Sequence, residues 1–588
     1  MDGTQESEES LLGPLNGKFI YRKNKDGTVN KNAVICSLCK KEFSYHRSSS
    51  SLTYHLNAKH VRASSTVKVA ASDANATVSS LRQPTLAELG KRMSKATTEK
   101  LTNSIAKWVA ADCRPISIVE DEGLKEAFQI ASSDPNFQLP SRTTVMKRIH
   151  QLYSDERTAK EKLLAEASYV ALTGDHWTSI SNHNYLGVTA HLIDRGWKLK
   201  SFALTVSKTV TRHYADACAE QFDAVTKEWE IENKVTTIGT DSARNMVAAA
   251  RQLPFDHIPC AAHMLQRTIT ACLEDNSFGT ALAKCRKIVG HFRHSPASTE
   301  ELHQQQTALG QAREPLVQDV STRWNSTLSM ISRYLRNHEA VNATLATQKH
   351  KLATLTNLEC DKLQKLEAVL EPCKYVTELL GGESYVSCSV VLPALCHLNR
   401  VMDPTDEDPG YMIKFKTTFS KDIDTRMANI NNRWLKVATA LDPRFKDLKS
   451  IHRNERDEVW TWIEEMLQES EVGPATPQPT EDEPAAKKSL LLLSSDSDSD
   501  EEQGPLARYK AEQCIRMHEC PLEWWAAHAG AYGQLSSLAR KYLATPATSV
   551  PCERLFSLAG NIIQKKRAAL HSDNVNKLVC LSNWLKET

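Results

Sequence analysis

The chain has 588 residues, 41% of them hydrophobic, and its 73 Lys and Arg nearly balance 71 Asp and Glu. This length exceeds what one hydrophobic core normally carries, so several domains are expected, and a net charge of +2 points to no particular partner. The acidic start MDGTQESEES, the lack of any apolar run of membrane-spanning length and 15 scattered cysteines predict a reducing compartment, no membrane partner and no disulfide framework.

The first chemical signal is a cluster of cysteines and histidines. Cys36, Cys39, His55 and His60 follow the spacing C-x2-C-x15-H-x4-H. Two thiolates on a tight turn and two imidazoles near a helix end suit a closed, tetrahedral, structural Zn²⁺ site. Serines before the helix are expected to cap it, and basic residues surround the cluster. A domain this small needs its metal to fold, so residues 16–62 are predicted to be a zinc finger.

The segments around the predicted finger differ from it in composition. Residues 1–15 are acidic and predicted to be disordered, and residues 63–84 are rich in Ser, Thr and Ala, which is typical of a flexible linker. Residues 85–165 carry Leu, Ile and Val at three- and four-residue spacing and are predicted to be helical. This pattern also fits a plain packing layer.

Two β-rich runs each precede an aspartate. SYVALTG leads into Asp175, and KVTTIGT leads into Asp241. Such runs are typical of buried strands, and a carboxylate at a strand end points into a crevice. We expect both aspartates to end neighbouring strands, with Ser242 capping the next helix and leaving Asp241 free for metal. A surface cap or turn is the ordinary role of a single aspartate at such a place.

Further strands complete the predicted α/β unit, which covers residues 166–275. The remaining strand candidates are 185–194 and 200–206, and a helix is predicted over 213–230. A third acidic residue, Glu553, lies about three hundred residues later in an amphipathic helix. If the fold brings the three carboxylates together, they form an oxygen-only site for Mg²⁺ or Mn²⁺, suited to phosphodiester chemistry.

Two further pairs can serve either binding or packing. Cys260 and His263 are spaced to share one helical face, and no second pair with ligand spacing stands near to make a zinc site. Arg323 can contact a phosphate, and the adjacent Trp324 can stack on an extruded base. A tryptophan on a helix is more often part of a core.

The rest of the chain is helical in pattern, with one interruption. Residues 276–540 are predicted to be all-α, apart from a disordered acidic loop over 471–505. Within that loop residues 490–502 (LLLLSSDSDSDEE) resemble a SUMO-interacting motif, and a solvated linker is the favoured alternative. Its serines also resemble acid-directed kinase sites.

The last segment, residues 541–588, combines apolar and basic helical residues. Its apolar set consists of Leu555, Phe556, Ile562, Leu570, Val575, Leu578, Leu581 and Trp584. Lys565, Lys566 and Arg567 interrupt this set with charge suited to DNA backbone contact or nuclear import, and a solvated helix face is the alternative.

Several motifs occur in an order known from one family. GDHWTS (174–179), TDSARNM (240–246), CAAH (260–263), VSTRWNST (320–327) and ATSVPCERLFSLAG (547–560) together resemble the hAT superfamily of DNA transposases and the BED-finger proteins derived from it. The finger resembles a BED finger whose upstream aromatic pair is Phe19 and Tyr21.

The resemblance implies an architecture. It implies a multidomain α/β plus all-α protein, in which an RNase H-like core is interrupted by a large all-α insertion and completed by its last helix. It gives Asp175, Asp241 and Glu553 a catalytic role and Cys260 with His263 a role in positioning DNA. It also implies that 85–165 assist DNA binding and that 541–588 support a homodimer or higher oligomer.

Two functions are consistent with these expectations. One is a nuclear, double-stranded-DNA-binding transposase that cuts and joins strands with Mg²⁺ or Mn²⁺. The other is a domesticated transcription regulator, in one line of relatives linked to SUMO, that binds DNA through the finger without transposition. The intact acidic triad favours retained chemistry.

Overall fold

The computed structural model describes residues 13–60, 93–348, 352–471, 504–563 and 570–586, apart from residues 16, 25, 27, 46–48, 133, 135, 210–213, 275 and 321. The chain divides into two compact units, Met1–Leu89 and Gly90–Thr588. The part of the chain outside this description includes residues 1–12, the whole predicted linker (63–84), the candidate SUMO-binding segment 490–502 and the basic residues Lys565, Lys566 and Arg567. The predictions for these segments stay predictions.

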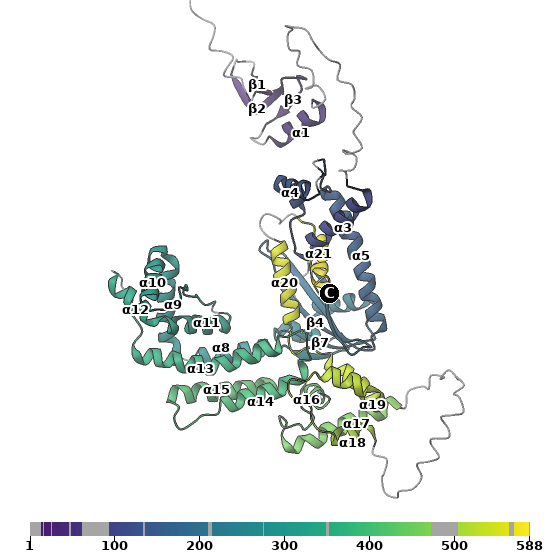
Figure 1. Ribbon diagram of the computed structural model, residues 1–588, viewed down its shortest axis with the longest axis vertical. Helices are drawn as coiled ribbons and strands as arrows, with labels where there is room; N and C mark the ends of the chain where they lie inside the picture. The colour runs from purple at the N-terminus through teal and green to yellow at the C-terminus, as the bar shows by residue number, and fades with distance from the viewer. Residues whose placement is uncertain are drawn as a thin grey trace, which may run out of the picture. The chain divides into compact units, whose positions relative to one another are not determined.

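The first unit is a small antiparallel sheet with one helix (Figure 1). Strands β1 (Phe19–Lys23), β2 (Val29–Cys36) and β3 (Glu42–Ser44) pair in that order, and helix α1 spans Ser50–Lys59. Ser49 occupies the N-cap position but makes no side-chain capping bond, so the expected serine cap is wrong there. Its backbone is already helical, whereas a capping serine needs an extended one.

The second unit begins with helices that cover the central sheet. They are α3 (Lys95–Ala111), the 3₁₀ turn η3 (Ile116–Glu120), α4 (Glu122–Ser132) and α5 (Arg142–Glu166). Ser94 and Ser141 cap α3 and α5 by accepting hydrogen bonds from Thr97 N and Thr144 N. Ile105, Val109 and Ile149 are buried in the same core as the sheet, so these helices do form a packing layer.

The central sheet has five strands and mixed pairing. The strands are β4 (Val170–Thr178), β5 (Asn184–Ile193), β6 (Leu199–Thr209), β7 (Val235–Thr240) and β8 (Asp256–Pro259), in the order β6-β5-β4-β7-β8. β5 runs antiparallel to its two neighbours, β4 and β6, whereas β7 and β8 run parallel to β4. The expected α/β core is confirmed.

Helices lie on both faces of this sheet. α6 (Ala215–Glu228) and α7 (Arg244–Ala250) pack together, and α8 (Ala261–Leu273) follows β8 directly. Phe222 of α6 lies so close to Gly174 of β4 that a Cβ there would stand 2.2 Å from its ring. Because neighbouring residues of a strand face opposite ways, Asp175 lies on the other face.

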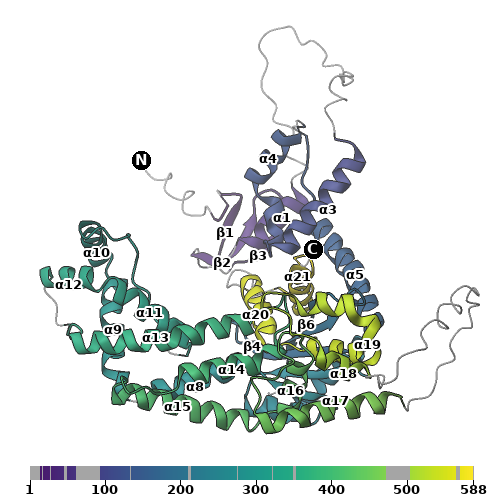
Figure 2. The ribbon, with the colours of Figure 1, turned by 60° about the horizontal axis from the view of Figure 1, so that its bottom comes forward.

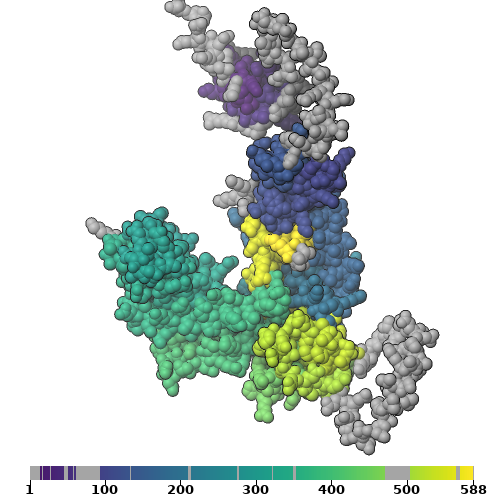
Figure 3. All heavy atoms as spheres, viewed as in Figure 1, coloured from purple at the N-terminus to yellow at the C-terminus, as the bar shows by residue number. Residues whose placement is uncertain are grey.

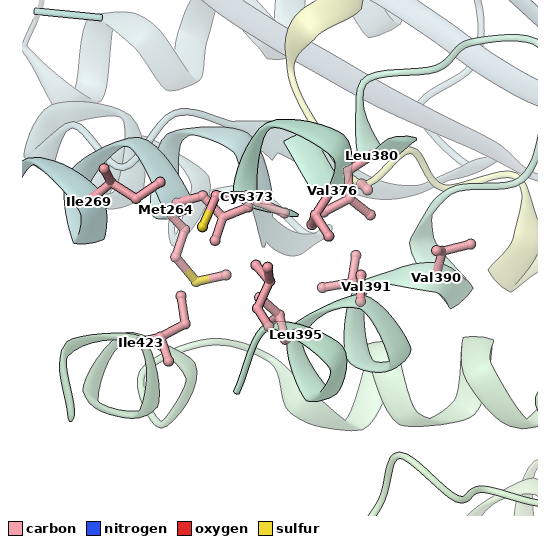
Figure 4. Close-up of a cluster of buried hydrophobic side chains, with 14 of the residues drawn as sticks. Met264, Ile269, Cys373, Val376, Leu380, Val390, Val391, Leu395 and Ile423 are labelled. Atoms are coloured by element: carbon pink, nitrogen blue, oxygen red, sulfur yellow. The ribbon is translucent and has the colours of Figure 1, made fainter. Parts of the chain in front are cut away.

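A long all-α insertion separates α8 from the last two helices (Figure 2). Its helices are α9 (Asn276–His294), α10 (Pro296–Ala308), α11 (Trp324–Arg336), α12 (His338–Thr347), α13 (Asn357–Leu380), α14 (Val391–Val401), α15 (Gly410–Met427), α16 (Asn432–Ala440), α17 (Arg456–Glu471), α18 (Pro505–Ala511) and α19 (Pro521–Leu543), with 3₁₀ turns η4 (Cys388–Val390) and η5 (Arg453–Glu455). Figure 4 shows Met264 and Ile269 of α8 facing Cys373, Val376 and Leu395 in one apolar cluster. The insertion core therefore begins on the helix that leaves the sheet.

The last two helices return to the sheet. α20 (Val550–Ile562) contacts β4, β5 and β6, and α21 (Ser572–Trp584) packs on β6, α3 and α5. In Figure 3 the yellow atoms of this segment lie against the blue atoms of the helices that begin the second unit. The predicted interruption of the α/β core by the insertion is confirmed.

Side chains of α21 occupy the open edge of β6. Asn583 Oδ1 accepts a hydrogen bond from Ala203 N (2.7 Å), and Asn576 Oδ1 accepts one from Val206 N (2.8 Å). The indole of Trp584 donates to Ala203 O (2.9 Å). These bonds satisfy main-chain groups that an edge strand otherwise leaves unpaired.

The apolar residues of the C-terminal segment serve this chain's own core. Leu555, Ile562, Val575, Leu578, Leu581 and Trp584 are all buried with the sheet residues, and Phe556 is also buried. Trp584 stacks on Tyr153 of α5 at 5.2 Å between ring centroids. Any association between copies through this region must therefore use other residues of it. Among the described helices, none is long and apolar enough to cross a membrane.

We predict that Gly174→Ala lowers the free energy of unfolding of the second unit by about 1–3 kcal/mol or more. The reason is that the new methyl group overlaps the buried ring of Phe222. The measurement is urea-induced unfolding followed by circular dichroism. Gly530→Ala is the matched control, since Gly530 is exposed within α19 and a methyl group there meets nothing within 4 Å. That variant should be unchanged or stabilised by up to about 1 kcal/mol. Equal stability of the two variants would contradict the close contact.

Candidate functional site

The four predicted zinc ligands of the finger converge. Their donor atoms all lie within 4.8 Å of one another. Cys36 Sγ lies 3.6 Å from His60 Nε2, Cys39 Sγ lies 3.2 Å from His55 Nε2, and the two Nε2 atoms are 3.1 Å apart. A tetrahedral zinc ion has sulfur–nitrogen and nitrogen–nitrogen edges of about 3.4–3.6 Å. The donor set therefore fits structural Zn²⁺.

Aromatic rings hold one of these ligands in place. Phe43 of β3 lies 4.6 Å from the His55 ring, and Phe19 of β1 lies 6.2 Å from it, between centroids. Phe19 is fully buried, whereas Tyr21 packs against Tyr45 at 6.2 Å. Phe19 was expected to belong to the aromatic support, but Phe43 was not. Its sequence context, a single aromatic in a three-residue strand, gives no signal of the contact.

Asp175 lies inside β4, not at its end. β4 pairs with β7 only as far as Thr173, but its pairing with β5 continues to Thr178. The expectation that Asp175 ends a strand is therefore wrong for the hairpin side and holds only for the parallel pairing. The carboxylate accepts a hydrogen bond from His176 N (2.7 Å).

Asp241 directly follows the last residue of β7, the neighbour of β4, as expected. Its Oδ1 accepts a hydrogen bond from Ala243 N (3.1 Å). Helix α7 has Ala243 at its N-cap position without a side-chain cap, so the predicted capping role of Ser242 is wrong. Asp241 takes part of that role itself, because its carboxylate is the nearby acceptor.

Glu553 reaches the sheet through a close helix contact. It lies in the first turn of α20, and its side chain is 42% exposed. Gly187 of β5 pairs directly with Asp175, and a Cβ there would lie 2.8 Å from the Phe556 ring. Cys552, the residue before Glu553, donates a hydrogen bond from Sγ to Gly187 O (3.0 Å). The absent side chain at Gly187 thus brings the start of α20 beside Asp175.

The three acidic residues influence one another electrostatically. Burial is the largest cause that raises the pKa of Asp175 to about 7. The negative charge of Asp241 is the second cause, and the charge of Glu553 adds to the rise. The hydrogen bond from His176 N and the charge of His263 oppose it. Such a shift signals negative charge that lacks full compensation, which a divalent cation would supply.

His263 adds a positive charge to this group. It lies in the first turn of α8, and its Nδ1 is 3.9 Å from Glu553 Oε1. The hydrogen bond with Cys260 is the main reason that the pKa of His263 rises to about 9, and Glu553 and Asp175 contribute. Cys260 is buried at the N-cap position of α8. His263 therefore lies beside Glu553, with Cys260 at the start of the same helix.

The donor chemistry of this second site fits a hard cation. Carboxylate oxygens are the ligands that Mg²⁺ and Mn²⁺ prefer. In the described part of the chain, the finger residues form a cluster with ligand atoms within 4.8 Å of one another, whereas the three carboxylates form no such cluster. The three carboxylates therefore lie farther apart than the zinc ligands do.

Arg323 and Trp324 differ in accessibility. Trp324 is only 2% exposed and belongs to the insertion core, where its backbone N donates to Gln266 Oε1 (3.3 Å). Its indole is therefore a packing group in this structure, which agrees with the alternative stated for it above. Arg323 is exposed at the N-cap position of α11.

Family models match four parts of the chain. Residues 23–61 match the BED zinc finger, 173–264 the ZBED1 RNase-like domain, 258–371 the ZBED1 RNase-like helical domain and 505–585 the hAT family C-terminal dimerisation region. The chain thus carries a BED zinc finger, ZBED1-type RNase-like domains and a hAT family dimerisation region, and its homologues are hAT transposases and ZBED proteins.

The names of individual relatives describe a transposase, a BED domain-containing protein and a transcriptional regulator. It is 26% identical to a Zea mays protein named "Putative AC transposase", over 80% of this chain and 63% of that protein. It is 22% identical to "Zinc finger BED domain-containing protein RICESLEEPER 3" of Oryza sativa subsp. japonica, over 94% and 81%. It is 21% identical to "Putative transcriptional regulator tpeD" of Talaromyces stipitatus, over 79% and 59%. The chain thus spans less than two thirds of the maize and Talaromyces relatives.

We predict that removal of zinc unfolds the finger alone. Cys36→Ser, or a strong chelator on the wild type, should abolish the amide dispersion of residues 18–60 in NMR spectra, because the fully buried Phe19, Val34 and Leu52 cannot hold the fold without the metal. The second unit should keep its thermal midpoint. Cys514→Ser is the control, since Cys514 is an exposed cysteine outside the finger. Retention of a folded finger in the chelator would contradict the zinc assignment.

We predict a pH-dependent cost of Asp175 in the absence of divalent metal. Its folded pKa of about 7 exceeds the unfolded value of about 4, so stability should fall as pH rises from about 4 to 7. Asp175→Asn should therefore unfold at a higher temperature than wild type above pH 7, with the difference vanishing near pH 4, in calorimetry. His263 adds a further loss of stability in the same direction at higher pH: its stabilisation is complete below about 6.5 and is lost as the pH rises through about 9. Parallel pH profiles for variant and wild type would contradict the prediction.

Proposed function

We propose that this chain is a nuclear DNA-binding protein of hAT type that cuts and joins DNA strands with Mg²⁺ or Mn²⁺. The observation that supports it most is the meeting of Asp175, Asp241 and Glu553 beside one sheet. They come from three separated segments, and the charges of Asp241 and Glu553 add to the rise that burial causes in the pKa of Asp175. A core built only for stability gains nothing from three adjacent carboxylates, since their repulsion is destabilising.

Asp175, Asp241 and Glu553 would hold the divalent ion or ions through carboxylate oxygens. When bound, such ions activate water or a 3′-hydroxyl and stabilise the leaving oxygen in phosphodiester chemistry. The sheet contributes a fixed position for Asp175, since β4 is paired on both sides at Thr173 and with β5 through Thr178. Asp241 is oriented by its bond from Ala243 N.

His263 would place a positive charge next to these carboxylates and toward a DNA phosphate. Its raised pKa keeps the imidazolium protonated at neutral pH, so it can donate a charge-assisted hydrogen bond. Cys260 supports that state from the N-cap of α8. This gives physical content to the expected DNA-positioning role of the pair.

Contacts with double-stranded DNA would involve two further parts of the chain. The finger carries Lys18, Arg22, Lys31, Lys40, Lys41 and Lys59 in its described part. Arg323, exposed before α11, is suited to a phosphate contact, whereas base stacking by Trp324 would require its removal from the core. The matched C-terminal dimerisation region supports a homo-oligomer.

A regulator without transposition is the second candidate. The finger and the remainder of the chain are separate compact units, so DNA binding does not need the acidic site. The relative named as a transcriptional regulator matches over 79% of this chain. The acidic residues and His263 are nevertheless all present and adjacent here, which favours the transposase.

We predict that Asp175→Asn, Asp241→Asn and Glu553→Gln each reduce metal-dependent nicking of a transposon end by at least about a thousandfold, because ligands of shared ions act as a unit. Each variant should still bind the same DNA in a gel-shift assay. Glu523→Gln is the control, since Glu523 is an exposed acidic residue in the first turn of α19 and should not matter. Equal cleavage by wild type and all three variants would refute the catalytic assignment. A wild type that binds its end but never cleaves it with Mg²⁺ or Mn²⁺ would favour the regulator.

A further inference from the structure

The first turn of α20 makes contacts in three directions. Residues four apart share a helix face, so Cys552 and Phe556 form one face and Val550 and Arg554 another. Cys552 and Phe556 meet the sheet at Gly187. Glu553 lies between these faces and is directed toward His263. Its position therefore depends on both faces of the turn.

Arg554 joins this turn to the end of α13 in the insertion. Its Nη2 donates a hydrogen bond to Gly381 O (2.9 Å), and its Nη1 forms an ion pair with Glu383. A Cβ at Gly381 would lie 3.8 Å from Val550 Cγ2, so the backbone at Gly381 also lies beside the helix. Gly381 is the residue at the C-cap position of α13, where helices leave carbonyls unpaired. The planar guanidinium contacts the carbonyl through one terminal nitrogen and the carboxylate through the other.

The contact partners of Arg554 belong to a firmly packed part of the insertion. Leu380, Val390 and Val391, which flank the connection, are buried in the apolar cluster with α8 (Figure 4). Ser387 Oγ accepts a hydrogen bond from Ala547 N (3.0 Å), three residues before α20 begins. The connection from α13 to η4 is therefore a fixed support and not a free loop end.

We infer that Arg554 is a positioning residue: through Gly381 and Glu383 the helical insertion sets the place of Glu553 in the metal site. This inference rests on the proposed function. Glu553 is the ligand that comes from outside the continuous part of the sheet domain, and Asp175 and Asp241 sit at their places without the insertion. A change in the tilt of α13, such as DNA bound on the insertion would impose, would move Glu553 through this contact. The insertion thereby acts on the chemistry and not only on DNA affinity.

The test uses the full-length, zinc-loaded protein and Mn²⁺ as the probe, titrated by electron paramagnetic resonance. Arg554→Ala should weaken Mn²⁺ binding by about tenfold, as is usual when a residue that orients a metal ligand is removed. It should also increase hydrogen exchange in residues 550–556. Glu383→Gln, which keeps the size of the partner side chain, should have a smaller effect in the same direction. DNA binding in a gel-shift assay should be unchanged.

Arg333→Ala is the matched control. Arg333 of α11 also bridges a main-chain carbonyl and a carboxylate, those of Pro315 (2.8 Å) and Glu314 (3.2 Å), but it does not contact α20. It should leave Mn²⁺ binding and exchange in residues 550–556 unchanged.

Two of the remaining outcomes would contradict the inference, and a third would contradict the proposed function. If Arg554→Ala binds Mn²⁺ like the wild type and exchange at 550–556 is unaltered, the inference is wrong. If Arg333→Ala has the same effects as Arg554→Ala, general destabilisation explains them and the inference is wrong. If wild type and Asp175→Asn bind Mn²⁺ equally, the proposed function fails. Hydrogen exchange at residues 550–556, measured without Mn²⁺, then still shows whether Arg554 holds the first turn of α20 in place.

Discussion

The approach of α20 to the sheet at Gly187 is the contact on which the acidic site depends. β5 has no side chain at the position paired with Asp175, and the ring of Phe556 and the thiol of Cys552 occupy that space. This arrangement brings Glu553 close to Asp175 of β4 and to Asp241, which follows the neighbouring strand β7. A larger residue at Gly187 would move α20 outward, and Glu553 with it. The placement of the three carboxylates thus depends on Gly187, a residue that has no reactive or metal-binding side chain.

The cost of this arrangement is electrostatic and is partly offset locally. Asp175 is buried and faces the negative charges of Asp241 and Glu553. His263 lies close enough to reduce that repulsion, and its own protonated form is favoured in return. The imidazolium of His263 therefore offsets part of the negative charge of the carboxylates. Bound cations or protons must offset the remaining negative charge. Sites that store such a cost are usually functional ones, because natural cores avoid it.

The parts that could be predicted from sequence are those specified locally. The zinc ligands follow from spacing, the strands before Asp175 and Asp241 follow from their β-rich runs, and the helices follow from apolar periodicity. The place of Glu553 came only from the ordered set of motifs, because no local pattern reports a contact across about three hundred residues. Gly187, Phe43 and Arg554 were missed for the same reason: each matters through a neighbour that is distant in sequence. Trp324 shows the reverse case: its motif and its place on a helix left base stacking and core packing both open, and the surrounding helices bury it.

The seal that α21 places on the edge of β6 has a consequence for synthesis. The five strands are complete once residue 259 has been made, but Asn576, Asn583 and Trp584 come only after the whole insertion. Until then the outer strand of the sheet presents unpaired main-chain groups, which other extended chains can join. The whole insertion must leave the ribosome during that interval. Nascent chains of this protein therefore have a long period in which they are prone to aggregate, and a premature stop shortly before α21 would leave that period without an end.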